Sequence, residues 1–278
     1  MSRPSRAFET RSSAEPSPLT PEQTAAWVRA YGRQSRVYAW GFFLLMLPAI
    51  LGGVSADLSQ RVRVGYRLLL TIGSAGLLCS LLGFGITRLG VGWLDAQLVA
   101  FPILGVLLAA FAIGGLPHAF NIIDGYNGLA GAVAIFTCLA IAHVALQLGD
   151  RQLASVVLCL AGATGGFLVW NYPKGKIFAG DGGAYVWGMV IGWVCVALVQ
   201  RHAVVSPWFP VMLLVYPLCE TFFSIYRKMA RGQSPGHADA LHFHQLVFRR
   251  IVRPVLLDDE ARELLVRNSK TAPYLWMF

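Results

Sequence analysis

Three aspartates in this 278-residue chain lie next to long apolar runs and together suit phosphate chemistry. Asp57 ends the first run, Asp124 lies in a polar stretch at residues 118–129, and Asp181 belongs to a Gly-Asp-Gly-Gly string at residues 180–183. Mg²⁺ prefers oxygen ligands and usually takes one or two carboxylates, completing its shell with water and substrate phosphates. The pattern predicts a Mg²⁺-dependent phosphate site with Asp181 as a metal ligand, although each string by itself also fits an ordinary turn.

The polar stretch at residues 118–129 joins two of the apolar runs. It offers the Asn121 amide and the Asp124 carboxylate, and Gly125 and Gly128 allow sharp turns there. A carboxylate where a bilayer helix meets water is costly, which makes it a candidate functional residue. The alternative is a polar turn in which Asn127 caps the next helix.

A histidine-rich segment follows the last apolar run and contains His237, Asp239, His242 and His244. Zinc is one candidate ligand, because histidine often binds it, but no tetrahedral set is obvious. With Arg249 nearby, the segment fits a cradle for a diphosphate better. The alternative for Arg249 is a solvated or lipid-headgroup-facing surface. Lys176, beside the Gly-Asp-Gly-Gly string, has the right charge to neutralise phosphate, and its alternative is simple positive-inside charge.

The composition places these residues in a membrane protein, since the chain is 56% hydrophobic and only 13% charged. Apolar runs near the ~20 residues needed to cross a bilayer recur along it. We expect an all-α polytopic membrane helix bundle with about seven spans, at residues 37–55, 68–86, 98–116, 129–148, 153–170, 185–199 and 205–224. A net charge of +9 suggests nucleic acid binding in a soluble protein, but these basic residues cluster in loops. We therefore expect membrane lipid and no nucleic acid as partners.

If successive spans alternate in direction, all of the polar clusters described above fall on one face of the membrane. That face carries 14 lysines and arginines, whereas the opposite loops carry three. Because cytoplasmic loops are enriched in Lys and Arg, the pattern predicts a cytoplasmic site. Residues 1–36 contradict it, since they carry six arginines and an odd number of spans would place them outside.

Both ends of the sequence suggest a truncated chain. Either a span is absent upstream or the first span sits differently, which would account for the misplaced arginines, and the last seven residues resemble a span that has barely begun. Residues 1–36 are polar and rich in Ser, Pro and Arg, so we expect them to be disordered or loosely attached. Residues 37–278 would form the membrane domain, with a cytoplasmic histidine loop at residues 225–270.

Three ordered motifs then resemble one family. They are Asn-Ile-Ile-Asp-Gly-Tyr-Asn-Gly-Leu at 121–129, Phe-Ala-Gly-Asp-Gly-Gly at 178–183 and His-Ala-Asp-Ala-Leu-His-Phe-His at 237–244. Together they resemble the polyprenyl-phosphate N-acetylhexosamine-1-phosphate transferases of glycosyltransferase family 4, in the undecaprenyl-phosphate N-acetylglucosamine-1-phosphate transferase branch. The resemblance covers roughly residues 45–278.

The resemblance implies an enzyme of the bacterial inner membrane with its active site facing the cytoplasm. Such an enzyme transfers a sugar-1-phosphate from a UDP-N-acetylhexosamine to undecaprenyl phosphate, releases UMP and starts a cell-surface glycan. Mg²⁺ is the implied cofactor, with Mn²⁺ as a substitute, and a homodimer is one assembly it allows.

The resemblance also implies roles for individual residues. Asp181 is the magnesium ligand, and Asn121 and Asp124 bind substrate or metal. Asp57 is the acid proposed to deprotonate the lipid phosphate. The histidine loop, with His237, His242 and His244, lies near the diphosphate and uridine.

Several positions depart from the family pattern. The acidic pair of the family reads Ala56-Asp57 here, its first central Asn is His118, its second central Asp is Asn127, and the Ser after its Gly-Asp motif is Ala184. These departures keep a truncated, inactive relative as an alternative. A membrane transporter is a weaker alternative, because transporters place charged residues within their spans.

Overall fold

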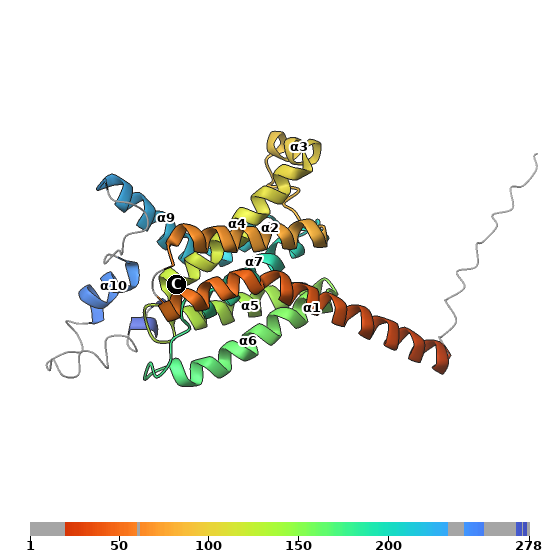
Figure 1. Ribbon diagram of the computed structural model, residues 1–278, viewed down its shortest axis with the longest axis horizontal. Coiled ribbons are helices and arrows are strands. Elements are labelled where there is room, and N and C mark those ends of the chain that lie inside the picture. Colours follow the sequence, from red (N-terminus) through yellow and green to blue (C-terminus); the bar gives the residue numbers. More distant parts are fainter. Residues whose placement is uncertain (1–19, 60–61, 233–241, 253–270, 274, 277–278) are drawn as a thin grey trace, which may run out of the picture. The chain divides into compact units, whose positions relative to one another are not determined.

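The computed structural model describes residues 20–59, 62–232, 242–252, 271–273 and 275–276, with the backbone alone described at residues 23–38. The chain divides into two compact units, residues 1–43 and residues 44–278, and the second holds the candidate site. The helices are α1 (Pro21–Ser59), α2 (Val64–Leu82), α3 (Gly92–Ala100), α4 (Pro102–Ile123), α5 (Leu129–Gln147), α6 (Arg151–Asn171), α7 (Gly180–Arg201), α8 (Trp208–Leu213), α9 (Val215–Ala230), α10 (Phe243–Val247) and the π-helix η1 (Phe248–Val252) (Figure 1).

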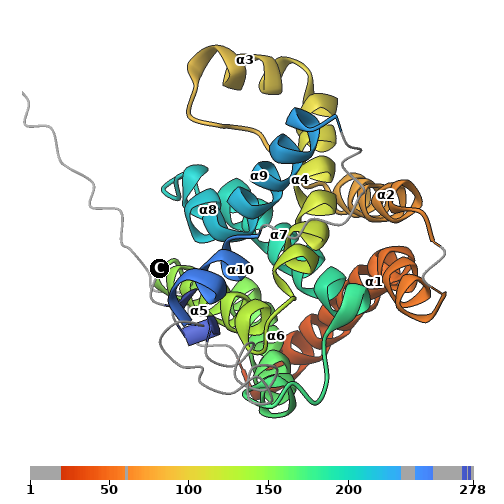
Figure 2. The same ribbon diagram turned by 90° about the vertical axis from the view of Figure 1, so that its left-hand side faces the viewer.

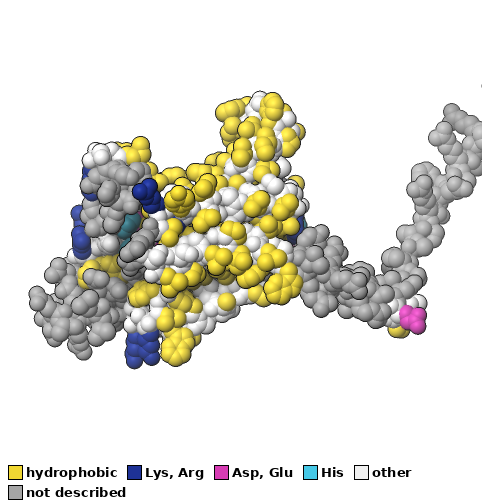
Figure 3. Space-filling model, viewed as in Figure 1, with side chains coloured by type: hydrophobic (Ala, Val, Ile, Leu, Met, Phe, Trp, Pro, Cys, Tyr) yellow, Lys and Arg dark blue, Asp and Glu magenta, His cyan; other side chains and the backbone are white. Residues whose placement is uncertain are grey.

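Long apolar helices dominate the described residues. Six of them are long and apolar enough to cross a membrane: Ala39–Ser59 within α1, α2, α4, α5, α6 and α7. Hydrophobic side chains spread over the flank of the bundle, while many of the Lys and Arg side chains lie at the end that holds α9 and α10 (Figure 3). The expected all-α membrane bundle is confirmed.

The seventh expected span, residues 205–224, is divided between α8 and α9, and neither piece is long enough to cross a membrane by itself. Pro217 explains the break, because proline has no N–H to donate to the carbonyl four residues earlier, at Leu213. The two pieces still lead from one end of the bundle to the other. Trp208 lies near Gly90 at one end, whereas Glu220 contacts His242 at the other.

The first helix starts earlier than expected. Residues 21–36, expected to be disordered or loosely attached, continue α1, and residues 1–19 lie outside the described part of the chain. Thr20-Pro21 is a typical helix start, since Thr favours the N-cap and Pro the first helical position. Local helix preference at this position outweighs the polar composition.

The two ends of the bundle are held by different contacts. At one end Arg88 donates to the backbone carbonyls of Val199 (3.0 Å), His202 (3.0 Å) and Val205 (2.5 Å), and Arg201 pairs with Asp150 (3.2 Å). The other end, called the motif end here, gathers the three sequence motifs and faces the viewer in Figure 2. The expected alternation of loops between two faces is confirmed.

Helix α7 lies at the centre, with 78% of its apolar window buried, and packs closely on α4, which also packs on α2. A Cβ at Gly188 of α7 would lie 2.2 Å from the backbone N of Pro117 in α4. A Cβ at Gly114 of α4 would lie 2.6 Å from the Cα of Ile72 in α2. Small residues that allow backbones this close are typical of membrane helix contacts, and they bring three helix ends together at the motif end.

Candidate active site

The N-terminus of α7 is capped by a carboxylate from another helix. Asp57 of α1 accepts hydrogen bonds from the backbone N–H groups of Asp181 (2.8 Å) and Gly182 (2.9 Å). The first N–H groups of a helix have no partner within it, and the helix dipole favours an anion there. A Cβ at Gly180 would lie 2.8 Å from the Asp57 oxygens, and Gly180 has φ +63°. Glycine at this position therefore lets α1 approach α7.

Asp181, in the first turn of α7, joins two further helices. One carboxylate oxygen accepts a hydrogen bond from Arg67 of α2, and the other accepts one from the Asn121 amide of α4. The side chains of Arg67 and Asp181 are 21% and 14% exposed, so the pair can still be reached by a ligand. Arg67 also hydrogen-bonds the Tyr185 side chain. Three helix ends thus meet at one carboxylate.

Asp124 completes the group of carboxylates as the C-cap of α4. It accepts hydrogen bonds from the backbone N–H groups of Gly180 and Ala179. Burial raises the pKa of Asp124 to about 7, and the Asp57 carboxylate adds to this effect while the two backbone hydrogen bonds oppose it. The three aspartates, far apart in sequence, therefore converge on the α7 N-terminus as expected.

His118 lies one helical turn from Asn121, behind this group. Its Nε2 is 3.1 Å from the Thr71 hydroxyl, and its Nδ1 is 3.4 Å from the Tyr185 hydroxyl. Because Tyr185 also holds Arg67, the off-pattern His118 supports the residues beneath Asp181 and is not a ligand at the surface.

A second polar cluster lies on α9 and α10 and centres on Glu220, whose side chain is 3% exposed. Glu220 accepts a hydrogen bond from the backbone N–H of Phe243 (2.6 Å), and its other oxygen lies 3.2 Å from His242 Nδ1. His244 Nδ1 lies 3.8 Å from Glu220 and 3.4 Å from the Tyr216 hydroxyl. The two imidazole rings are stacked, with 5.3 Å between their centroids.

His244 links this cluster to the central motif. Its ring meets the Tyr126 ring edge to face, with 4.9 Å between centroids, and a Cβ at Gly125 would lie 3.3 Å from its Nε2. Burial lowers the pKa of His244 to about 4, with Glu220 opposing and His242 reinforcing the effect. His244 is therefore a neutral, buried imidazole at pH 7, and His242, 12% exposed, is the partner that a ligand can reach.

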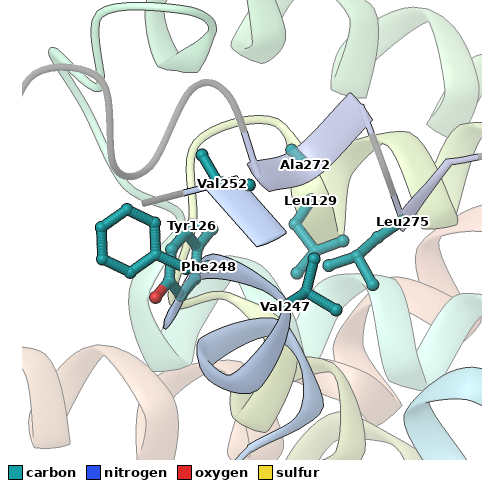
Figure 4. Close-up of a cluster of buried hydrophobic side chains, with 7 residues drawn as sticks. All are labelled: Tyr126, Leu129, Val247, Phe248, Val252, Ala272 and Leu275. Atoms are coloured by element: carbon teal, nitrogen blue, oxygen red, sulfur yellow. The ribbon is translucent and has the colours of Figure 1, made fainter. Parts of the chain in front are cut away.

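An apolar cluster holds the histidine segment against the motif (Figure 4). Its buried members come from the central motif, from α10 with η1, and from the last described residues: Tyr126, Leu129, Val247, Phe248, Val252, Ala272 and Leu275. At roughly 25 cal/mol per Å² of buried apolar surface, a cluster of this size contributes several kcal/mol to docking. The three segments consequently behave as one piece of structure beside Asp124.

The loop between α6 and α7 is tied to the central motif by two asparagines. Asn127 donates to the Pro173 carbonyl (2.8 Å). Asn171 donates to the Ile177 carbonyl (2.8 Å) and accepts from the Gly128 N–H (2.5 Å). Asn127, off-pattern for the family, thus has a structural contact that positions the loop before Asp181.

The basic candidates lie at the periphery. Lys176 is exposed on the α6–α7 loop, with its Nζ 5.2 Å from the centre of the Trp170 ring. Arg249 is exposed on η1. His237 lies outside the described residues. The structure therefore brings Asp57, Asn121, Asp124 and Asp181 together, and it places His242 and His244 one layer away.

Arg67 and Glu220 are the residues that the sequence did not single out. Arg67 appeared only as a basic loop residue, and Glu220 was hidden inside an expected span. A lone acid within an apolar run is costly, which is the signal that could have identified Glu220. No comparable signal distinguishes Arg67 from its neighbours Arg61 and Arg63.

The oxygen donors at the α7 N-terminus fit Mg²⁺ better than zinc. Among the described residues no group of three or more His, Cys, Asp or Glu side chains could hold a metal ion. Asp124, Asp181 and Asn121 offer hard oxygen donors, and Mg²⁺ takes its remaining ligands from water and phosphate. Zinc at the histidine segment is not supported, since the described part of that segment offers no set of three His, Cys, Asp or Glu side chains that could hold it.

Comparison with known proteins identifies a family. The model of the family described as glycosyl transferase family 4 matches residues 39–199. A probable undecaprenyl-phosphate N-acetylglucosaminyl 1-phosphate transferase of Bacillus subtilis is 29% identical over 73% of this chain and 55% of its own length. Undecaprenyl-phosphate alpha-N-acetylglucosaminyl 1-phosphate transferases of Thermotoga maritima and Escherichia coli K12 are each 26% identical, over 76% and 69% of this chain and 62% and 54% of their own lengths.

The chain thus spans a little over half the length of these curated relatives. The family match covers more than half of the chain, from the first membrane helix to the end of α7, and includes Asp57, Asp124 and Asp181. This protein therefore belongs to glycosyl transferase family 4.

Proposed function

We propose that this chain transfers N-acetylglucosamine-1-phosphate from UDP-N-acetylglucosamine to undecaprenyl phosphate, releases UMP and thereby starts a cell-surface glycan. The observation that carries the proposal is the convergence of Asp57, Asp124 and Asp181 with Arg67 at the N-terminus of α7. Names of the relatives supply the sugar and the lipid. The donor nucleotide follows from the family resemblance of the motifs.

The site suits a direct displacement between a lipid and a soluble nucleotide. An oxygen of the lipid phosphate attacks the phosphorus that carries the sugar, and the bond from that phosphorus to the bridging oxygen breaks. The bridging oxygen leaves with UMP, so a diphosphate bond is gained on the lipid and one is lost from the nucleotide. A position at the end of a membrane bundle fits a reaction whose acceptor is in the bilayer and whose donor is in water.

Each residue of the group has a distinct part. Asp57 holds the α7 N-terminus, and so the backbone of Asp181, in place. Asn121 orients the Asp181 carboxylate. Arg67 brings a guanidinium to the same point, where it can bind phosphate oxygens in bidentate fashion. Phosphoryl transfer depends mostly on such positioning and on charge neutralisation.

Asp124 and Asp181 are the residues that would hold Mg²⁺, or Mn²⁺ in its place. A bound divalent cation stabilises negative charge on the transferred phosphoryl group. Asp57 is poorly placed to accept a proton from the lipid phosphate as the resemblance implies, since both of its oxygens already accept backbone hydrogen bonds. We propose that its part is structural.

Basic residues orient the site. The motif end carries Lys176, Arg249 and Arg250, which the positive-inside rule assigns to the cytoplasm. We propose accordingly that the protein resides in the bacterial inner membrane with this end facing the cytoplasm, where nucleotide sugars are present.

A UMP-release assay tests the proposal. Protein purified in detergent should release UMP from UDP-N-acetylglucosamine only when undecaprenyl phosphate and MgCl₂ are both present. Asp181→Asn should lose at least 100-fold in kcat, because it removes the charge at the centre of the site. No UMP from an intact, folded preparation would reject the function.

An inactive relative is the second candidate, and Ala56 favours it. This residue is buried in α1 (7% exposed) at the position where the family has an acid. The same assay separates the two candidates. If the wild-type protein is folded but silent and Ala56→Asp gains activity, the loss of that acid accounts for the silence.

A further inference from the structure

Glu220 is the most deeply buried acidic side chain near the candidate site, and the proposed reaction gives it no direct part. At 3% exposure an ionised carboxylate is strongly destabilising unless hydrogen bonds and charge compensate it. Its described partners all come from the start of α10: the Phe243 N–H, His242 Nδ1 and, at longer range, His244 Nδ1. The carboxylate thus fixes one short segment and nothing else among these contacts.

The contacts on that segment lead directly to the central motif. Glu220 fixes the Phe243 N–H and His242, His242 stacks on His244, and His244 packs on Tyr126, two residues from Asp124. A buried charge on α9 is therefore connected, through two rings, to the residues that hold the phosphate groups.

The geometry also decides which ring atom faces a ligand. With Nδ1 of His242 donating to Glu220, the neighbouring carboxylate selects the tautomer and the ring orientation, and Nε2 is left on the opposite edge of the ring. The ring is that of the N-cap residue of α10, outside the candidate membrane spans among the described residues. Because this segment lies outside those spans, we infer that the soluble donor meets His242, whereas the lipid phosphate enters from the bilayer.

We propose that Glu220 is a positioning residue that sets the orientation of His242 and thereby the affinity for the diphosphate of the nucleotide-sugar donor. The inference rests on the proposed function, because it names the residue that prepares the donor side of that same site. Glu220 does not touch substrate. It acts through His242, and this route makes the proposal testable.

The Glu220→Gln variant distinguishes an effect on the orientation of the His242 ring from an effect on the stability of the protein. The Gln amide oxygen keeps the hydrogen bond from the Phe243 N–H, but its –NH₂ cannot accept from His242 Nδ1. We expect a melting temperature close to that of the wild type, a KM for UDP-N-acetylglucosamine raised at least 10-fold and an unchanged KM for undecaprenyl phosphate. Glu22→Gln, an exposed carboxylate in the first turn of α1, is the matched control and should change neither constant.

A double-mutant cycle tests the route through His242. If Glu220 acts through that imidazole, Glu220→Gln adds nothing to His242→Ala, and the double variant matches the single His242→Ala variant in donor KM. Independent, multiplying losses would overturn the proposal, and so would a Glu220→Gln variant with wild-type donor KM.

A readout without turnover keeps failure of the function distinct from failure of the inference. Protein with ¹⁵N-labelled histidine should show His242, assigned by the loss of its signal in His242→Ala, as protonated on Nδ1. In Glu220→Gln this preference should disappear. If the wild-type protein releases no UMP but the tautomer still depends on Glu220, the proposed function fails and the positioning role stands; an unchanged tautomer rejects the positioning role whatever the activity.

Discussion

Asp57 and Asp95 provide a matched pair at residue scale. Each accepts two backbone N–H groups: Asp57 from Asp181 and Gly182, and Asp95 from Leu89 (2.5 Å) and Gly90 (3.1 Å) at the opposite end of the bundle. Substitution by Asn leaves one accepting oxygen instead of two at each of these positions. The pair therefore separates a cap at the site from a similar cap far from it.

We predict that Asp57→Asn and Asp95→Asn each lower stability by roughly 1 kcal/mol, as lost caps do, but that only Asp57→Asn reduces UMP release by 10-fold or more. Thermal unfolding in detergent and the UMP assay provide the two measurements. Equal losses of activity in both variants would show that the effect of Asp57 is only a matter of stability.

His244 makes stability depend on pH. Its pKa falls from 6.5 to about 4 on folding, so the unfolded chain binds a proton between these values that the folded protein does not. The part of the free energy of unfolding that depends on His244 is therefore fully present above pH 6.5 and is lost as the pH falls toward 4. Its size is on the order of 3 kcal/mol, at 1.36 kcal/mol per unit.

We predict that His244→Phe, which keeps a ring against Tyr126, flattens the rise in melting temperature between pH 4 and pH 6.5. Comparison with the wild-type protein is essential, because the raised pKa of Asp124 acts with the opposite sign in this window. Parallel pH profiles for the two proteins would show that His244 is not the group that titrates.

At element scale, the helix crossings decide where the site residues lie. A Cβ at Gly188 would lie 2.2 Å from Pro117, so Gly188→Ala has to push α7 away from α4. We predict a loss of roughly 1–3 kcal/mol, typical of overpacking, together with reduced activity. Gly162→Ala in α6 is the control, because no atom lies within 4 Å of the added carbon. Thermal unfolding should show it to be neutral or slightly stabilising. Equal destabilisation of the two variants would show that the close contact between α7 and α4 has no particular effect on stability.

Helix boundaries show what sequence patterns can and cannot predict. Hydropathy identified six helices and the side on which each loop falls, because length and apolarity are local properties. It placed Asn121 and Asp181 in loops, yet α4 reaches Ile123 and α7 begins at Gly180, so these residues belong to a last and a first helical turn. Polar residues at helix ends are supported by partners far away in sequence, such as Arg67 and Asp57, which local patterns do not contain.

The same reason explains Glu220. Hydropathy treats residues 205–224 as one apolar run, in which a single acid is averaged away. Its partners come from a segment 22 and more residues later, and only the fold brings them together. The family motifs, by contrast, include Asp124 and Asp181 directly, since each motif is contiguous, and Asp57 follows from the Ala56-Asp57 pair.

At the scale of the whole molecule, charge asymmetry predicts an orientation. We expect Lys176→Cys, in a variant without the five native cysteines, to react with a membrane-impermeant maleimide only in inverted vesicles, and Arg151→Cys only in intact spheroplasts. Both parent residues are exposed, at opposite ends of the bundle. The reverse pattern would place the candidate site outside and remove access to nucleotide sugars.

The contact between Gly188 and Pro117 has a mechanical consequence. Where two backbones touch, the helices cannot move closer together but can rotate about the contact point, so the crossing acts as a pivot. Asp181 lies seven residues from Gly188, and at 1.5 Å per residue this is a lever arm of about 10 Å. A rotation of only about 5° then shifts Asp181 against Asn121 by about 1 Å, a displacement that can cost roughly 100-fold in rate. Changes in the buried contact between α4 and α7 therefore affect the chemistry at the end of the bundle without altering a single polar residue.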